Sequence, residues 1–120
     1  AGRIRSVPVT IGGSTYIPPI PFEDQVKQEL DDILHSEEGI DLAIDLVLYV
    51  MKKQLFLDGN KRTAIIFANH YLISHALGLL VVPADKVDEY KKVLISYYED
   101  ELKKTDIANF LKEKCWIKMK

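Results

Sequence analysis

Residues 54–64 read QLFLDGNKRTA, and this stretch separates two long apolar helical patterns. Its centre, Asp58-Gly59-Asn60-Lys61-Arg62, combines an acid, a glycine, an amide and two cations. A glycine lets the backbone approach a ligand, and the N–H groups in the first turn of the following helix point outward with the positive end of the helix dipole behind them. The pattern predicts an anion-binding turn, in which Lys61 and Arg62 hold phosphate and Asp58 offers oxygen to a divalent metal.

The same residues also fit a plainer interpretation. Asp-Gly-Asn is a common helix-breaking loop, in which Asn60 is an ordinary N-cap and the two cations are solvated. Six residues taken alone favour this plainer interpretation. The surrounding chain therefore has to decide between the two.

The composition describes one folded domain. A chain of 120 residues buries roughly two thirds of the surface that its unfolded form exposes. The formal net charge of −2 argues against a nucleic-acid partner held through phosphates, and no basic run indicates a membrane surface. The single Cys115 excludes an internal disulfide, and the sequence has neither a bilayer-spanning apolar run nor a signal-peptide start. We expect a cytoplasmic protein, and the start at Ala1 without Met agrees with a fragment of a longer chain.

The N-terminal part predicts a β-hairpin over residues 3–17, which alternate weakly and are rich in Val, Ile, Thr and Tyr. The hairpin would turn at Gly12-Gly13-Ser14, and Pro8 would keep its strand at an edge. Three prolines then form a stiff connector that forbids a helix until about Phe22. The expected organisation is a hairpin and connector over residues 1–21 and a helical core over residues 22–120.

Helical spacing of apolar residues predicts an all-α bundle of about five helices, at residues 23–35, 40–51, about 60–77, 85–98 and 105–115. The second is apolar on almost every face, as buried helices are, and Gln54 lies at or just beyond its end. The third should be the central buried helix, stopped by Gly78. Asp85 and Thr105 are expected to cap the last two helices.

Other groups of reactive residues predict no site. His70 and His75 are five positions apart, about 140° around a helix, so they do not share a face as metal ligands would. His35 is placed to cap a helix C-terminus. The tyrosines in the fourth helix are expected to pack in the core rather than stack on a ligand. Only the turn at residues 58–62 remains as a candidate site.

This turn resembles the signature of the Fic/Doc (Fido) family, His-x-Phe-x-(Asp/Glu)-Gly-Asn-(Gly/Lys)-Arg. The matching residues follow one apolar helix and open another, and they are Phe56, Asp58, Gly59, Asn60, Lys61 and Arg62. The upstream hairpin is similar to the family's flap, so the resemblance covers nearly the whole chain. It implies a Fic-like helical bundle with an N-terminal flap.

The resemblance also implies roles for individual residues. Asp58 would hold Mg²⁺ on the phosphates of ATP, the N–H groups around Gly59, Asn60 and Lys61 would form an anion hole, and Arg62 would hold phosphate charge. Phe56 would anchor the loop in the core. Family members mostly transfer AMP from ATP to a hydroxyl of a target protein, which residues 3–17 would register by strand addition.

Two residues depart from the family pattern. Gln54 stands where the family has the histidine that takes the proton from the attacking hydroxyl, and an amide is no base near neutral pH. Ile65 replaces a further arginine three residues after Arg62, which removes a partner for the terminal phosphate. The expectation is an ATP- and Mg²⁺-binding protein with impaired AMP transfer.

Two alternatives remain open. Lys61 in place of the second glycine resembles Doc-type members, which transfer a phosphoryl group. A degenerate, non-catalytic module that binds a protein segment through residues 3–17 is also compatible with the loss of the histidine.

Overall fold

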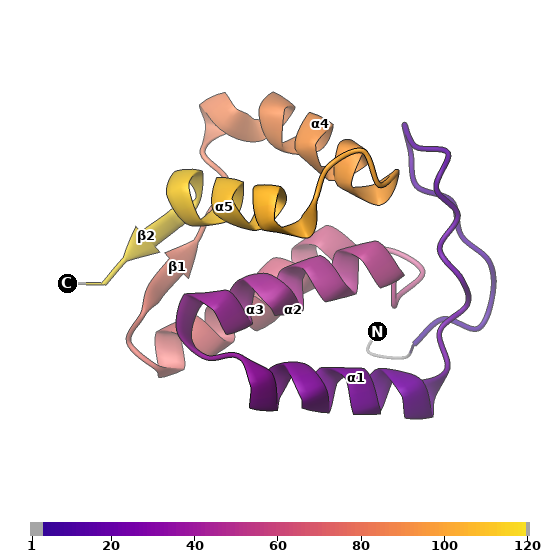
Figure 1. Cartoon of the computed structure of the whole chain (residues 1–120), viewed down its shortest axis with the longest axis horizontal. Coiled ribbons are helices and arrows are strands. Elements are labelled where there is room, and N and C mark those ends of the chain that lie inside the picture. The colour runs from indigo at the N-terminus through magenta and orange to yellow at the C-terminus, as the bar shows by residue number, and fades with distance from the viewer. Residues whose placement is uncertain (1–3, 120) are drawn as a thin grey trace.

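The computed structural model describes residues 4–119, and within them the expected bundle of five α-helices is confirmed. Figure 1 shows α2 and α3 side by side in the middle, with α1 on one side of them and α4 and α5 on the other. Within residues 4–119, no helix combines the length and apolar character needed to cross a bilayer. The elements in chain order are α1 (Glu23–Ser36), α2 (Gly39–Lys53), α3 (Asn60–Ser74), β1 (Gly78–Leu80), the 3-10 helix η1 (Ala84–Lys86), α4 (Val87–Tyr98), α5 (Lys104–Lys114) and β2 (Trp116–Lys118).

Helix α2 is the core element, as its apolar sequence predicted. It packs against α1, α3 and α5, so almost every face is covered by another helix. Its buried side chains are Leu42, Ala43, Ile44, Val47, Leu48, Val50 and Met51. Gln54 therefore directly follows a helix that is fixed by its neighbours.

Helix α3 is not buried on all sides, in contrast to the expectation. Ala64, Ala68 and Leu72 are fully buried, whereas Ile66 and Phe67 on another face are 58% and 51% exposed. The apolar residues of α3 surround the helix, but the bundle has enough neighbours to cover only one stripe of it. The two small alanines let the backbones of α2 and α3 approach closely.

The end of α3 also differs from the prediction, since the helix stops at Ser74 and not at Gly78. Ala76 adopts a left-handed conformation with φ of 56°. The Leu77 N–H donates to the Leu72 carbonyl at 2.8 Å, and the Ala76 N–H donates to the Ile73 carbonyl at 3.1 Å. These two bonds form a Schellman motif, built here without the usual glycine.

Gly78 instead permits a strand pairing that sequence patterns missed. With φ of +115°, it begins β1, and a Cβ at this position would lie 2.0 Å from the Ile117 carbonyl oxygen. Strands β1 and β2 are antiparallel, with Leu79 opposite Ile117. Only a residue without a side chain allows this approach.

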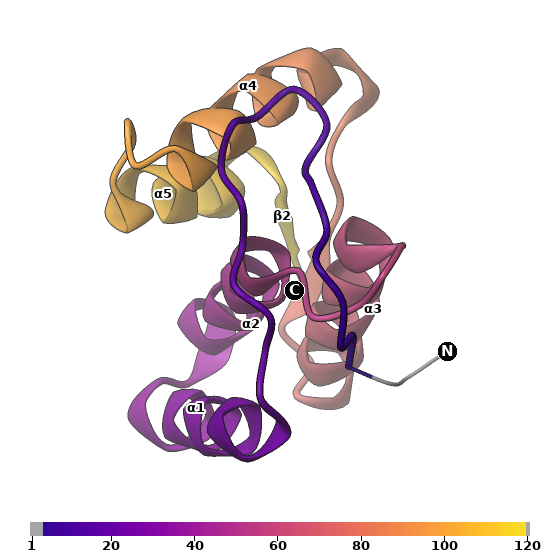
Figure 2. The ribbon, with the colours of Figure 1, turned by 90° about the vertical axis from the view of Figure 1, so that its right-hand side faces the viewer.

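The predicted hairpin over residues 3–17 is not formed as paired strands. Arg3 lies outside the described residues, and no strand is present in residues 4–21, here called the N-terminal segment. The segment does reverse at the glycines, where the Ser14 N–H donates to the Ile11 carbonyl at 3.1 Å. Beyond this turn, the backbones of its two arms do not pair within residues 4–21, and Arg5 and Thr15 bond the segment to the helical body. Figure 2 shows the segment as a loop that arches from α1 to α4 and returns.

Helix α1 begins at Glu23, so the proline connector ends where it was expected to end. The expected caps of the last two helices are wrong. Asp85 lies within η1 and Thr105 within the first turn of α5, and neither helix has a side-chain cap bond at its N-terminus.

The close approach of α2 and α3 gives a prediction for Ala68. Replacing Ala68 with Leu adds bulk to a filled core and should lower the free energy of unfolding by about 1–3 kcal/mol. Urea unfolding measures this loss. The control His70→Leu places the same leucine side chain at an exposed position two residues away and should change stability little; equal stability of both variants would contradict the packing described.

Candidate functional site

The candidate site is the connection between α2 and α3. Helix α2 ends at Lys53, and Gln54 leaves it in the left-handed conformation, with φ of 48° and ψ of 60°. Gly59 is the residue before α3 and is also left-handed, with φ of 71°, which a glycine adopts at no steric cost. The loop thus reverses the chain through two left-handed positions, and Asp58 to Arg62 lie at the head of α3 as predicted.

Asn60 braces the loop with its side chain and is only 6% exposed. Its Oδ1 accepts the Phe56 N–H at 3.0 Å, and its Nδ2 donates to the Phe56 carbonyl at 2.8 Å and to Gln54 Oε1 at 3.1 Å. The alternative interpretation of Asn60 as a plain N-cap is wrong, because Gly59 holds that position. All three hydrogen bonds of this side-chain amide are made to residues of the loop.

The head of α3 offers backbone donors for an anion. The first N–H to bond within the helix is that of Thr63, which donates to the Gly59 carbonyl at 2.8 Å. The N–H groups of Asn60, Lys61 and Arg62 precede it and are those that a helix leaves without an acceptor of its own. The Gly59 N–H differs, since it donates to Asp58 Oδ1 at 2.8 Å.

The charged residues of the turn lie at its surface. Asp58, Lys61 and Arg62 are all exposed. The Arg62 guanidinium folds back over Gly59, so that a Cβ on Gly59 would lie 3.0 Å from Arg62 Nη2. The glycine therefore has a second role, which is to leave room for the arginine beside the backbone.

Gln54 is anchored at both ends of its side-chain amide. Nε2 donates to the Met51 carbonyl in the last turn of α2, and Oε1 accepts from Asn60. The side chain therefore ties the end of α2 to the head of α3. Phe56, expected to anchor the loop, is only partly buried, and the neighbouring Leu55 is the loop side chain that enters the core at 3% exposure.

A pocket of about 510 Å³ opens beside the turn. One wall is Gln54 together with residues 57–62, and the opposite wall is the reversal of the N-terminal segment at residues 10–12. Tyr98 from the end of α4 also lines it. The Tyr98 hydroxyl is buried and has no hydrogen-bond partner within the described residues, and burial raises the pKa of Tyr98 to about 12.

Glu99 holds the tip of the N-terminal segment against α4. Its Oε1 accepts the Thr15 N–H at 2.8 Å, the Thr15 hydroxyl at 3.1 Å and the Ser14 hydroxyl at 3.1 Å. These donors stabilise the charged carboxylate, and the pKa of Glu99 is lowered, chiefly by the backbone N–H of Thr15. The pocket wall at residues 10–12 thus depends on a carboxylate that sequence reasoning had not selected.

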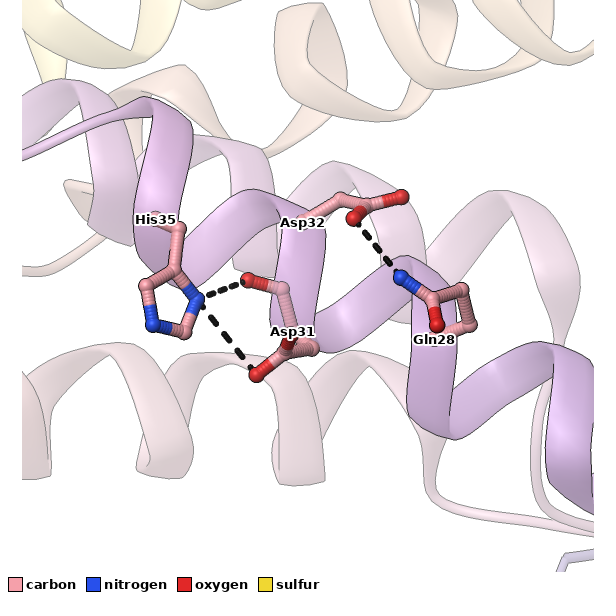
Figure 3. Close-up of polar contacts among 4 residues, drawn as sticks. All are labelled: Gln28, Asp31, Asp32 and His35. Atoms are coloured by element: carbon pink, nitrogen blue, oxygen red, sulfur yellow. Dashed lines mark hydrogen bonds and ion pairs between the residues drawn. The ribbon is translucent and has the colours of Figure 1, made fainter.

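The three histidines are dispersed over α1, α3 and the residue after α3. Within residues 4–119, no group of three or more His, Cys, Asp or Glu side chains is placed to hold a metal ion. Figure 3 shows His35 in the last turn of α1, with Nδ1 at 2.7 Å from the Asp31 carbonyl oxygen and 3.4 Å from its carboxylate. The C-cap of α1 is Glu37, whose N–H donates to the Ile33 carbonyl, so the expected cap by His35 is wrong. Gln28 and Asp32 pair on the same solvent-facing helix.

The sequence of the chain matches the model of a known protein family. The model of the Fic/DOC family matches residues 1–72, which is more than half of the chain. The matched part covers the N-terminal segment, α1, α2, the loop and most of α3, and therefore the whole turn. No curated protein matches the chain.

The bonds of Glu99 predict a pH-dependent contribution to stability. Because its pKa is lower in the folded state, its contribution is present above the unfolded value near 4.5 and is lost as the pH falls through the folded value. The free energy of unfolding of Glu99→Gln should therefore be lower than that of the unmutated protein at neutral pH, and this difference should shrink at about pH 3. Urea unfolding at both pH values measures it.

Glu113→Gln on α5 is the control, because this exposed residue has no polar contact in the described structure. It should show no such pH-dependent difference. A difference for Glu99→Gln that stays constant with pH would contradict the role assigned to the carboxylate.

Proposed function

Because the chain belongs to the Fic/DOC family, we propose that it binds ATP with Mg²⁺ at the turn Asp58–Arg62 and that Gln54 impairs the transfer step. The observation that carries the proposal is the head of α3. Three backbone N–H groups without helical acceptors, two cations and a glycine-permitted approach meet at one side of a pocket. This is the chemistry that holds phosphate at a helix N-terminus.

The pocket supports a ligand larger than a phosphate ion. Its volume of about 510 Å³ is within the usual range for small-molecule sites, about 300–1,000 Å³. Tyr98 lines the same pocket, and its buried hydroxyl has no hydrogen-bond partner within the described residues. The phosphates would lie at the turn, and the remainder of the nucleotide would extend toward Tyr98 and the N-terminal segment.

The donor set fits Mg²⁺ in the manner of nucleotide sites. This ion is usually bound through one or two carboxylates together with substrate phosphates, and it keeps several waters. Asp58 is exposed beside the pocket and uses Oδ1 to accept the Gly59 N–H, so its other carboxylate oxygen is available to a metal. When bound, Mg²⁺ supplies charge that stabilises the reacting phosphates.

The transfer step is impaired because residue 54 has no basic nitrogen. The Gln54 amide donates to Met51 and accepts from Asn60, so it is used as a structural tie. Loss of a general base typically slows a reaction by about 10²- to 10⁴-fold. Ile65 adds to the defect, since it packs partly buried against the core and offers no charge to the terminal phosphate.

Two observations keep the alternative functions in view. Lys61 lies exposed at the pocket, and it is the residue by which the turn resembles Doc-type members, which transfer a phosphoryl group. The N-terminal segment forms no strand within residues 4–21, so backbone groups outside its contacts with Arg5, Leu55 and Glu99 could accept a protein segment by strand addition. Either function would use the same fold.

Nucleotide binding is tested by thermal unfolding with ATP and Mg²⁺. At a ligand concentration about 100 times Kd, the free energy of unfolding should rise by about 2.7 kcal/mol, which gives a clear increase in Tm. Asp58→Ala and Arg62→Ala should remove the increase, whereas Lys92→Ala, exposed on α4, should keep it. An unmutated protein whose Tm ignores ATP and Mg²⁺ would refute nucleotide binding.

The role of position 54 is tested by Gln54→His. Restoring a base should raise transfer to protein hydroxyls by about 10²-fold or more. Labels on the α- or γ-phosphate of ATP tell AMP transfer from phosphoryl transfer. Gln54→Asn is the control, since it changes the side chain without adding a base. If Gln54→His binds ATP but shows no gain in transfer, the larger defect lies elsewhere, as at Ile65.

A further inference from the structure

Arg5 is a buried cation at the base of the N-terminal segment, with 3% of its surface exposed. Its guanidinium donates to four backbone carbonyls. Two belong to the end of α2, Lys53 at 3.0 Å and Gln54, and two belong to the N-terminal segment, Val7 at 3.0 Å and Pro19 at 2.9 Å. Its own N–H donates to the Leu55 carbonyl at 2.8 Å. One residue therefore contacts both arms of the segment and three consecutive residues at the end of α2 and the start of the loop.

The charge of Arg5 is balanced by dipoles rather than by an acid. Within residues 4–119, no carboxylate forms an ion pair with it. The last carbonyls of a helix lack partners and carry the negative end of its dipole, which suits a cation. Hydrogen bonds from charged donors are stronger than neutral ones, so Arg5 holds these carbonyls firmly.

The position of Gln54 makes this contact significant. Gln54 is a non-glycine residue in the left-handed region, a conformation that persists only where the surroundings enforce it. Arg5 holds its carbonyl, and Asn60 holds its side chain. A residue of the N-terminal segment, Arg5, thus holds the peptide group that follows the Cα atom of Gln54.

We infer that Arg5 is a positioning residue, which fixes the backbone of residue 54 and joins the base of the N-terminal segment to the site. The consequence for catalysis rests on the proposed function, because it requires residue 54 to lie at a nucleotide. The positioning itself does not, because it is a property of the protein without ligand. Together with Glu99 at the tip, Arg5 sets the wall of the pocket from two ends.

The test uses nuclear magnetic resonance of the ligand-free protein. Arg5→Met should shift the side-chain amide signals of Gln54 and Asn60. It should also speed exchange of the Phe56 N–H, which Asn60 Oδ1 accepts, by about tenfold or more. Arg5→Lys keeps the charge but has a compact ammonium that cannot reach all four carbonyls, so it should give smaller changes in the same direction.

Leu111→Ala is the matched control, since this fully buried residue of α5 lies far along the chain from the loop. It should lower Tm without moving the Gln54 and Asn60 signals. If Arg5→Met loses as much stability as Leu111→Ala but leaves these signals and Phe56 exchange as in the unmutated protein, the positioning role is overturned. If Arg5→Met does not fold, the same comparison with Arg5→Lys decides.

Activity provides a second measurement in the Gln54→His background. Adding Arg5→Lys should lower kcat while KM for ATP stays within about twofold, because residue 54 acts in the transition state rather than in binding. If kcat does not fall, the inference is overturned. If Gln54→His alone shows no transfer, the proposed function fails, and the resonance measurements still decide the role of Arg5.

Discussion

The site depends on the buried side-chain amide of Asn60. A loop that reverses between two packed helices leaves peptide groups without helical partners, and burying them unpaired would be costly. Asn60 pairs both the N–H and the carbonyl of Phe56 and then reaches Gln54. The three exposed charged residues Asp58, Lys61 and Arg62 are consequently presented on a loop whose backbone is already fixed. Preorganised donors of this kind bind an anion without first having to be ordered.

The two halves of the site differ in what holds them. The half for which we propose phosphate binding is built from the backbone at the head of α3, so it depends on helix geometry and on Gly59 more than on any single side chain. The half at residue 54 depends on a side chain, and glutamine there preserves the contacts of the loop without supplying a base.

Sequence reasoning predicted what depends on local pattern. The apolar spacing of α2 predicted its burial, and the prolines predicted where α1 begins. The residues Asp58–Arg62 predicted the turn and indicated the family. It failed where distant parts of the chain decide. The segment around Gly12 and Gly13 has hairpin composition, yet Arg5 bonds its base to the end of α2 and Glu99 bonds its tip to the end of α4. Arg5 itself carried no signal, since one arginine in an extended stretch resembles any exposed cation.

The ends of α3 and the small sheet illustrate the same limit. A helix stop at glycine is the usual pattern, but Ala76 takes the left-handed position, and Gly78 is used elsewhere. Strand β2 has only three residues, and its partner is far away in sequence, so no local periodicity marks it. The exposed face of α3 was likewise hidden, because an apolar sequence does not tell how many neighbours a helix will find.

Gly78 has a consequence for how variation in this chain should be interpreted. Any side chain at this position would meet the backbone of β2 at a distance that no rotamer can relieve, since the obstacle is the Ile117 carbonyl and not a movable side chain. Mutational tolerance at residue 78 should therefore be as low as at the residues of the turn, although residue 78 lies at the far end of α3. Positions that do not tolerate substitution should therefore fall into two groups. One group maintains the geometry of the turn, and the other maintains the pairing of β2 with β1.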